Sequence, residues 1–291
     1  MEPFSSSISE TVETLSSSLV SVHGRRGYPL SGAVWSDGII VTTNRAVGRG
    51  DVHVGLPDGE MAEADLVGRA PNVDLAALKL ASETLSTPTW INTDKLKVGQ
   101  VMLRLGRPGG VRVTMGVLSG LEPWQSRAGV RLDSAIMTDA DPFPGFSGGV
   151  LATLAGELVG VNTAALGRSG DTVIPTATID KTVEELLTHG RVRQGYLGIS
   201  GQPVKLPEAL RAEQGQRAGL LILSVTSGSP AEQAGLTQGD VVLSLNGVKV
   251  ARPGALAAEL TGDEVGETLP LMVARGGQVQ TFEVVVAEMA E

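Results

Sequence analysis

The run from Pro144 to Gly149, PGFSGG, holds the residues best arranged for chemistry in this sequence. A serine between glycines can stand on a tight turn, because glycine adopts the backbone conformations that such a turn needs. Backbone N–H groups of the same turn can converge on the negative oxygen that develops when a serine hydroxyl attacks a carbonyl. Ser147 is therefore a candidate nucleophile for acyl transfer, although the motif alone is equally compatible with an ordinary Gly-Ser turn.

Other catalytic chemistries have few residues to draw on. The chain contains no cysteine, which excludes thiolate catalysis, disulfides and cysteine zinc sites. The three histidines, His23, His53 and His189, are scattered and form no HExxH or His-x-His cluster. We therefore expect no metal and no other cofactor.

Residues 145–149 also satisfy the G-x-S-x-G elbow of α/β-hydrolases. That elbow requires a strand before the serine and a helix after it. Ser147 is instead followed by VLATLAGELVGVNT, two strand-like runs around a glycine turn. Asp180 and His189 follow in the hydrolase order, but they stand too close behind, and no strand–helix alternation precedes them. We discount the hydrolase interpretation for these reasons.

The elements that hold this turn are expected to be strands. A chain of 291 residues is long enough for two domains, and 38 Gly with 15 Pro favour short strands and many turns. Strand-like runs fall into two sets of similar length, at about 22–91 and 98–178, with hardly any helix between them. This pattern predicts a mostly β fold with two barrels packed together. The clearest runs are GIIVTT (38–43), DVHVGL (51–56), DLAALKL (74–80), QVMLRLG (100–106), RVTMGVLSGL (112–121), GVRLDSAIMT (129–138), GVLATLAGELVGVNTA (149–164) and DTVIPTAT (171–178).

Helical periodicity is confined to a few segments. Residues 5–22 read as an amphipathic helix or extended arm, and residues 179–189 as a helix that Gly190 ends. The basic piece 191–195 reads as a linker. Residues 196–291 then form a smaller α+β unit, with a short helix at 255–260 and a closing hairpin around Arg-Gly-Gly.

The surroundings of Ser147 resemble the active-serine region of HtrA-type proteases, a branch of the chymotrypsin fold. The family pattern is Thr-Asp-Ala, then Pro-Gly-x-Ser-Gly-Gly, then a strand, a glycine turn and Val-Gly-(Ile/Val)-Asn-Thr. Upstream, NVDLAALKL resembles the family segment Asp-Leu-Ala-Val-Leu-Lys, which puts Asp74 at the position of the triad aspartate. The runs VGQVMLRLGRPGG and VTMGVLSGL match further family segments. Matching residues are Thr138, Asp139, Ala140, Pro144, Gly145, Ser147, Gly148, Gly149, Gly160, Val161, Asn162 and Thr163.

This resemblance covers nearly all of residues 5–190 and implies a chymotrypsin-like protease domain over 1–190. It places the site in the cleft between two β-barrels, with Ser147 as nucleophile. It also implies an oxyanion hole made by Gly145, Phe146 and Ser147. Phe146 departs from the family, which usually has Asn there, so its ring is expected to support the turn or partly fill the site.

The resemblance also reveals a missing base. The family histidine lies seven residues after the glycine of an Asp-Gly turn, and seven residues after Gly38 this chain has Arg45. A slip of one residue gives Asn44 or Ala46 instead. Arginine stays protonated and has no acceptor site, so it cannot take the proton of a serine hydroxyl. Loss of the histidine lowers turnover by roughly 10⁶ in a well-studied serine protease.

Arg45 has other possible roles. Beside Asp74 it is expected to form a bidentate ion pair that occupies the place of the triad, with a surface arginine as the alternative. Rescue by His53, His23 or His189 is disfavoured, because each is better placed for a structural or solvent-exposed role.

Residues 196–291 resemble a PDZ domain of the kind that HtrA-type proteases carry. The resemblance rests on SGSPAEQAGLTQGDVVLSLNGVKV, which begins at Ser227. It implies that the backbone of Tyr196-Leu197-Gly198-Ile199 captures the carboxylate of a peptide that adds to the sheet edge. The helix with Leu256 and Leu260 would form the side wall. A closed groove used only for contact between domains is the alternative.

The combined hypothesis is an HtrA-like protein that is catalytically impaired and binds peptides, protein C-termini or unfolded segments. The competing hypothesis is an active serine endopeptidase that uses Ser147 with an unconventional base, and a third is a cleft that binds a small ligand through Arg45 and Asp74. The resemblance implies a homotrimer, with Phe4 and the N-terminal arm as candidate contacts, and export to the periplasm or cell envelope. No signal peptide or membrane-spanning run is recognised, and a net charge of -9 disfavours nucleic acid and anionic membranes as partners.

Overall fold

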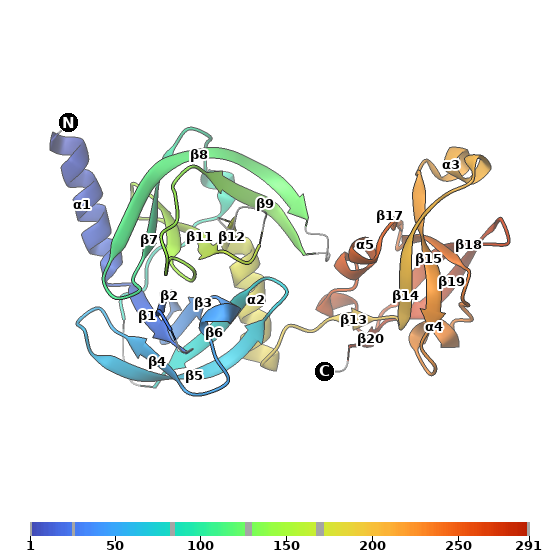
Figure 1. Ribbon diagram of the computed structural model, residues 1–291, viewed down its shortest axis with the longest axis horizontal. Coiled ribbons are helices and arrows are strands. Elements are labelled where there is room, and N and C mark those ends of the chain that lie inside the picture. The colour runs from blue at the N-terminus through green and yellow to red at the C-terminus, as the bar shows by residue number, and fades with distance from the viewer. Residues whose placement is uncertain (1, 25–26, 82–84, 126–129, 167–171, 290–291) are drawn as a thin grey trace. The chain divides into compact units, whose positions relative to one another are not determined.

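The computed structural model describes residues 2–24, 27–81, 85–125, 130–166 and 172–289. The chain forms two compact units. Unit 1 comprises Met1–Trp124 and Leu132–Val192, and unit 2 comprises Gln125–Arg131 and Arg193–Glu291. Unit 1 contains two closed six-stranded barrels, and unit 2 contains a six-stranded sheet with short helices (Figure 1). The predicted mostly β fold with two barrels and a following α+β unit is therefore confirmed.

The first barrel has the strand order β1-β2-β3-β6-β5-β4, and its neighbouring strands are antiparallel. Its interior is filled by valine, leucine, isoleucine and alanine, as the low aromatic content predicts; Val20, Ile40, Val54 and Leu78 are almost completely buried there. The strands are β1 Leu19–His23, β2 Leu30–Ser36, β3 Ile39–Thr42, β4 Val52–Gly55, β5 Met61–Ala70 and β6 Leu75–Leu80.

The second barrel has the order β10-β11-β12-β9-β8-β7 and its own core, which includes Met102, Leu118, Leu151 and Val159. β10 lies between β7 and β11, with Val150 opposite both Leu105 and Val161. This central position fixes the segment that immediately precedes β10, which is the serine turn. The strands are β7 Val101–Gly106, β8 Arg112–Gln125, β9 Arg131–Thr138, β10 Val150–Thr153, β11 Leu158–Thr163 and β12 Thr172–Pro175.

Two helices accompany the barrels. α1 (Glu2–Ser16) begins and ends earlier than the expected segment 5–22, because the residues from Leu19 enter the first barrel as β1. The Thr11 hydroxyl on α1 donates to the carbonyl of Leu154, in the turn between β10 and β11, at 2.8 Å. α2 (Thr176–His189) starts before the expected Ile179 and ends, as predicted, at Gly190 in the left-handed conformation. Among the helices that the structure describes, none has the length and apolar character needed to span a membrane.

Unit 2 contains a sheet of order β14-β15-β16-β18-β19, to which β17 adds beside β16, and a separate β13–β20 pair. The predicted hairpin at Arg-Gly-Gly is confirmed, because β18 and β19 pair up to Arg275 and Gln278. α3 was not expected from the sequence. The strands are β13 Gly195–Tyr196, β14 Ile199–Lys205, β15 Ala218–Val225, β16 Val241–Leu245, β17 Val248–Lys249, β18 Thr268–Arg275, β19 Gln278–Val285 and β20 Ala287–Glu288, and the helices are α3 Glu208–Gln214, α4 Pro230–Gln233 and α5 Pro253–Ala258.

Candidate active site and peptide-binding site

Ser147 lies on a tight turn directly before β10. The flanking Gly145 and Gly148 have φ angles of 92° and 86°, a region that side-chain-bearing residues rarely adopt. The turn is fixed by backbone hydrogen bonds from Gly148 to the carbonyl of Asn162 at 2.8 Å and from Gly149 to the carbonyl of Phe146 at 2.9 Å. The turn predicted from PGFSGG is therefore present, and Gly145 and Gly148 adopt the positive φ angles that it needs.

The two positions after the serine also require glycine because backbone atoms of neighbouring strands pack closely against them. A Cβ atom at Gly148 would lie 1.9 Å from the carbonyl oxygen of Ser31, and one at Gly149 would lie 2.2 Å from that of Leu105. Neither position has room for a side chain. The turn is pressed against β2 of the first barrel and β7 of the second.

The backbone N–H groups of the turn differ in their partners. The N–H of Phe146 donates to the carbonyl of Phe143 at 3.1 Å and is occupied. The N–H groups of Gly145 and Ser147, and the hydroxyl of Ser147, form no hydrogen bond within the described residues. Two neighbouring amides without an acceptor are available to an oxygen that develops negative charge. Of the three residues expected to form an oxyanion hole, Gly145 and Ser147 retain free donors in this conformation.

The Phe146 side chain is 1 % exposed and packs inside the protein. Its ring contacts the ring of Phe143 edge-on, with centroids 5.8 Å apart. A Cβ at Gly106 would lie 2.8 Å from its Cδ1 atom, so the ring rests on the end of β7. Of the two roles expected for Phe146, support of the turn agrees with this position.

Asp74 stands immediately before β6 and is held in an unusual conformation. Its φ angle is 54° and its side chain is buried. The Thr163 hydroxyl donates to Oδ2 at 2.6 Å, and the backbone N–H of Arg45 donates to Oδ1 at 3.2 Å. Burial raises the pKa of Asp74, while the bond from Thr163, the bond from the Arg45 backbone and the Arg45 charge each oppose the rise. The two hydrogen bonds favour the ionised carboxylate against the effect of burial.

Arg45 lies in the short 3₁₀ helix Asn44–Ala46, directly after β3. Its Nε atom is 3.8 Å from Oδ2 of Asp74, and its side chain is 44 % exposed. The expected ion pair is therefore present. It is a long contact through Nε rather than the bidentate fork expected, and the Thr163 hydroxyl donates to the same carboxylate oxygen.

Thr163 is a site residue that the sequence analysis did not single out as functional. It ends β11 in the second barrel and reaches Asp74 in the first. Thr163 is the last residue of the run Val-Gly-Val-Asn-Thr that matches the family. Sequence spacing does not show, however, that its hydroxyl binds an aspartate 89 residues earlier in the chain.

The three histidines lie on elements away from Asp74 and Ser147 in the sequence, and none of them bonds to either residue in the described part of the chain. His23 and His53 face each other across β1 and β4, and the Ser21 hydroxyl lies 2.9 Å from Nε2 of His23. Burial, together with the neighbouring His53, lowers the pKa of His23. His189 ends α2. No hydrogen bond joins any of the three to Asp74 or Ser147 in the described part of the chain.

In unit 2 the loop before β14 has free backbone donors. The carbonyls of Leu197 and Gly198 accept from Ala231 and Thr226 at 2.9 and 2.8 Å, whereas the N–H groups of Leu197 and Gly198 have no acceptor among the described residues. A Cβ at Gly198 (φ 82°) would lie 2.1 Å from that of Ser229. This loop therefore presents amides in a backbone shape that requires glycine.

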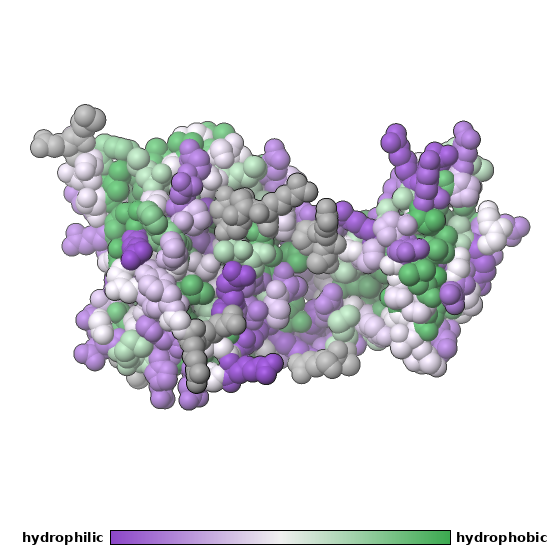
Figure 2. Space-filling view, viewed as in Figure 1, coloured by the Kyte–Doolittle hydropathy of each residue, from purple (hydrophilic) through white to green (hydrophobic). Residues whose placement is uncertain are grey.

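The strand that follows this loop is open on one side. β14 is an edge of the sheet, since its only neighbour in the order is β15. Ile199, at its start, is partly buried against the core. Figure 2 shows apolar residues gathered on the face of unit 2 where Figure 1 places β14 and β15, and Leu223 of β15 is exposed. An extended peptide can add to an edge of this kind.

The helix beside this edge differs from the expectation. α5 ends at Ala258, so Leu260 lies beyond the helix, where its carbonyl accepts from the N–H of Gly195 at 3.0 Å. Leu256 and Leu260 are each 6 % exposed and belong to the core. Their side chains therefore offer little exposed surface to a ligand. Beyond the helix, the Leu260 backbone is bonded to β13 instead of to another turn of helix.

A metal site has no support from the side chains. No group of three or more His, Asp or Glu residues suited to a metal ion occurs within the described ranges.

Comparison with known proteins agrees with this geometry. Residues 30–161 match the family model of the trypsin-like peptidase domain, and residues 195–286 match that of the PDZ domain. Two six-stranded barrels with a serine turn, followed by a peptide-binding fold, define a trypsin-like serine protease domain with a C-terminal PDZ domain. The chain is of the HtrA/DegP type, as its relatives show.

Among these relatives, a probable periplasmic serine endoprotease DegP-like from Chlamydia trachomatis is 34% identical over 264 residues, 88% of this chain and 53% of the relative. A protein of the same description from Marinomonas is 36% identical over 272 residues, 90% of this chain and 57% of the relative. The chain thus spans little more than half the length of these curated relatives.

Solved structures of similar proteins extend over almost the whole chain. The HtrA-type protease AlgW with a decapeptide is 26% identical with a TM-score of 0.79, covering 98% of this chain and 99% of that one. The serine endoprotease from Yersinia pestis is 28% identical with a TM-score of 0.77, covering 97% and 98%.

Proposed function

We propose that this chain is an HtrA-like protein with a silent protease site, which acts by binding peptides or unfolded protein segments through its PDZ domain. In this proposal residues 1–190 form the protease domain, 191–195 the linker and 196–291 the PDZ domain. Ser147 is the retained nucleophile, Asp74 the triad aspartate, and Arg45 stands where the base belongs.

The observation that carries this proposal is the position of Arg45 beside Asp74. Its backbone N–H and its guanidinium both contact the carboxylate, which supports the inference that Arg45 stands where a catalytic base would be needed. A guanidinium remains protonated and offers only donors. The Ser147 hydroxyl has no hydrogen-bond acceptor in the part of the chain that the structure describes. An activated serine needs such an acceptor.

The test compares cleavage of an unfolded protein by three forms: the chain as given, Ser147→Ala and Arg45→His. We expect the chain as given to be silent, and Arg45→His to gain activity because a base is restored. A second substitution, Ser147→Ala in Arg45→His, should abolish that gain and exclude a contaminating protease. Cleavage by the chain as given that Ser147→Ala removes would overturn the proposal.

An active serine endopeptidase with an unconventional base is the second candidate. Two observations favour it. The relatives are named serine endoproteases, and the amides of Gly145 and Ser147 remain free for an oxyanion. The same three forms distinguish the candidates, because only this one predicts cleavage without Arg45→His.

Peptide binding rests on the edge strand β14 and the free amides of Leu197 and Gly198. Backbone donors of this kind capture a C-terminal carboxylate while the peptide adds as a strand. The solved relative AlgW, named as an HtrA-type protease with a decapeptide, supports the same occupant here. We infer that the ligand is a peptide or protein segment with a free C-terminus.

Fluorescence anisotropy with paired peptides tests this inference. A peptide with a free carboxylate should bind at least about tenfold tighter than its amidated form, a difference of about 1.4 kcal/mol. Gly198→Ala should abolish binding, whereas Gly228→Ala has a similarly positive φ of 74° and nothing within 4 Å, and should retain it. Equal binding of both peptides would exclude carboxylate capture.

We further propose that the chain works in the periplasm or cell envelope, where the curated relatives are named as acting. Assembly as a homotrimer through Phe4 and α1 belongs to the same proposal, and Phe4 is exposed as such a contact requires. Sedimentation of the chain and of Phe4→Ser tests it: a trimer that Phe4→Ser weakens is expected.

A further inference from the structure

Ser31, on β2 of the first barrel, is completely buried at 0 % exposure beside the serine turn of the second barrel. It is one of the residues at which the first barrel contacts the serine turn of the second. Its carbonyl accepts from the Thr42 hydroxyl at 2.7 Å, and its N–H donates to the carbonyl of Ser147 at 3.0 Å. The backbone of Ser31 thus joins β3 to the nucleophile residue.

The hydroxyl of Ser31 makes two further contacts of defined direction. It accepts from the backbone N–H of Arg107 at 2.8 Å and lies 2.7 Å from the carbonyl oxygen of Gly145. Because Arg107 donates to it, the hydroxyl must use its own proton on Gly145. Arg107 is itself anchored, since its guanidinium donates to the carbonyl of Ser16 at 3.1 Å.

The Gly145–Phe146 peptide group is consequently held at both ends. Its carbonyl is bound by Ser31 and its N–H by the carbonyl of Phe143. Rotation of this peptide breaks both bonds and leaves two buried polar groups unpaired, at about 1–3 kcal/mol each. The adjacent amides of Gly145 and Ser147 are those left without an acceptor.

We propose that Ser31 is a positioning residue, whose hydroxyl fixes the Gly145–Phe146 peptide so that the amides of Gly145 and Ser147 stay free as a preformed oxyanion hole. The inference rests on the nucleophile role proposed for Ser147, but not on whether a base is present. It explains how the turn keeps two amides free whether or not a base is present.

The test is Ser31→Ala in the full chain, followed by amide hydrogen exchange and ¹H–¹⁵N spectra. We expect the amide of Phe146 to exchange at least about tenfold faster, and the resonances of Gly145 and Ser147 to shift. Ser18→Ala is the matched control, because Ser18 is also a buried serine of unit 1, but its hydroxyl binds no described residue. Unchanged exchange at Phe146 in folded Ser31→Ala overturns the proposal.

Ser31→Cys guards against a variant that does not fold, because it fills a similar volume and donates only weakly. An intermediate exchange rate at Phe146 is expected, and a rate equal to that of the unsubstituted chain counts against the proposal.

A second measurement uses Arg45→His, where cleavage can be followed. There Ser31→Ala should lower kcat by about 100-fold, the scale of losing one oxyanion donor, with KM within about twofold. A fall in kcat/KM through KM alone contradicts a positioning role. If Arg45→His gains no activity, the proposal about the base fails, while the exchange data still decide the role of Ser31.

Discussion

The Thr163 hydroxyl donates to Oδ2 of Asp74 at 2.6 Å, joining the end of β11 in one barrel to the start of β6 in the other. The carboxylate would otherwise be a buried charge balanced only by one backbone N–H and the more distant Arg45. Burial raises the pKa of Asp74, and the hydrogen bond from Thr163 is the largest of the contacts that oppose this rise.

Thr163→Val removes the hydrogen bond and keeps the shape. We expect it to raise the pKa of Asp74 further and to destabilise unit 1 by about 1.5–3 kcal/mol at pH 7, the usual contribution of a hydrogen bond to a charged group. Carboxyl ¹³C titration and urea unfolding measure the two effects. Thr188→Val on the exposed face of α2, where the hydroxyl binds only the carbonyl of Glu184, is the control and should change stability by about 0.5 kcal/mol or less.

The pH dependence of Asp74 has a definite sign. Its pKa is raised from 3.8 on folding, so between that value and the higher folded value the folded state holds more protons than the unfolded one. The contribution of Asp74 to stability is complete below the unfolded pKa and is lost as pH rises through the folded pKa. The measurement compares the free energy of unfolding of the chain with that of Asp74→Asn across this pH range. As the pH rises, the stability of the chain relative to Asp74→Asn should fall. A constant difference would contradict the raised pKa.

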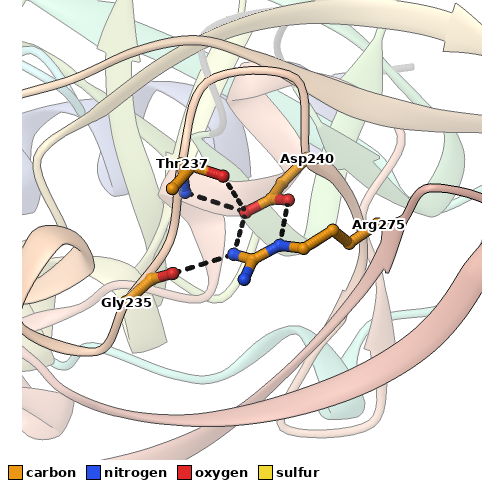
Figure 3. Close-up of polar contacts among 4 residues, drawn as sticks. All are labelled: Gly235, Thr237, Asp240 and Arg275. Carbon is orange, nitrogen blue, oxygen red and sulfur yellow. Dashed lines mark hydrogen bonds and ion pairs between the residues drawn. The ribbon is translucent and has the colours of Figure 1, made fainter.

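Arg275 and Asp240 form a bidentate ion pair in unit 2 (Figure 3). Nε and one terminal nitrogen of Arg275 each lie 2.7 Å from a carboxylate oxygen, and the same nitrogen donates to the carbonyl of Gly235. Burial acts to raise the pKa of Asp240, but Arg275 and the bonds from Thr237 outweigh it and lower the pKa. The pair closes the loop between α4 and β16.

Arg275→Gln should destabilise unit 2 by about 2–4 kcal/mol at pH 7, because it leaves a buried carboxylate without its partner. The penalty should shrink in acid, where the carboxyl of the variant takes up a proton. Hydrogen exchange of the β15 and β18 amides measures this loss of stability at each pH. Lys249→Gln, which loses one exposed bond to the carbonyl of Gly215, is the control and should change stability by no more than about 0.5 kcal/mol.

The β18–β19 hairpin turns on Gly276 and Gly277, with φ angles of 58° and 86°. Gly277→Ala should destabilise unit 2 by about 1–2 kcal/mol, since a Cβ disfavours this conformation. Thermal unfolding checks this. Gly50→Ala, at a position with no positive φ and nothing within 4 Å, should be neutral or slightly stabilising. Equal effects of the two substitutions would contradict the argument.

The sequence predicted the barrels, the serine turn and the approach of Arg45 to Asp74, because local periodicity and a matching register carry that information. It did not predict Thr163 or Ser31 as part of the site. Each acts through a hydrogen bond to a residue 89 or 114 positions away in the chain, and only the packing of two barrels brings them together. Leu260 was placed on the helix, whereas its carbonyl bonds to Gly195, a tertiary contact that local periodicity does not contain.

The 1.9 Å separation between a Cβ at Gly148 and the carbonyl of Ser31 bears on how such motifs are interpreted. Glycine is required there for the chain to fold, whether or not Ser147 ever attacks a carbonyl. A library selected for folding alone should therefore retain Gly148 and Gly149 while Ser147 varies. The glycines of a Ser-Gly-Gly string are therefore explained by packing and backbone conformation alone, and their presence does not by itself indicate a working serine nucleophile.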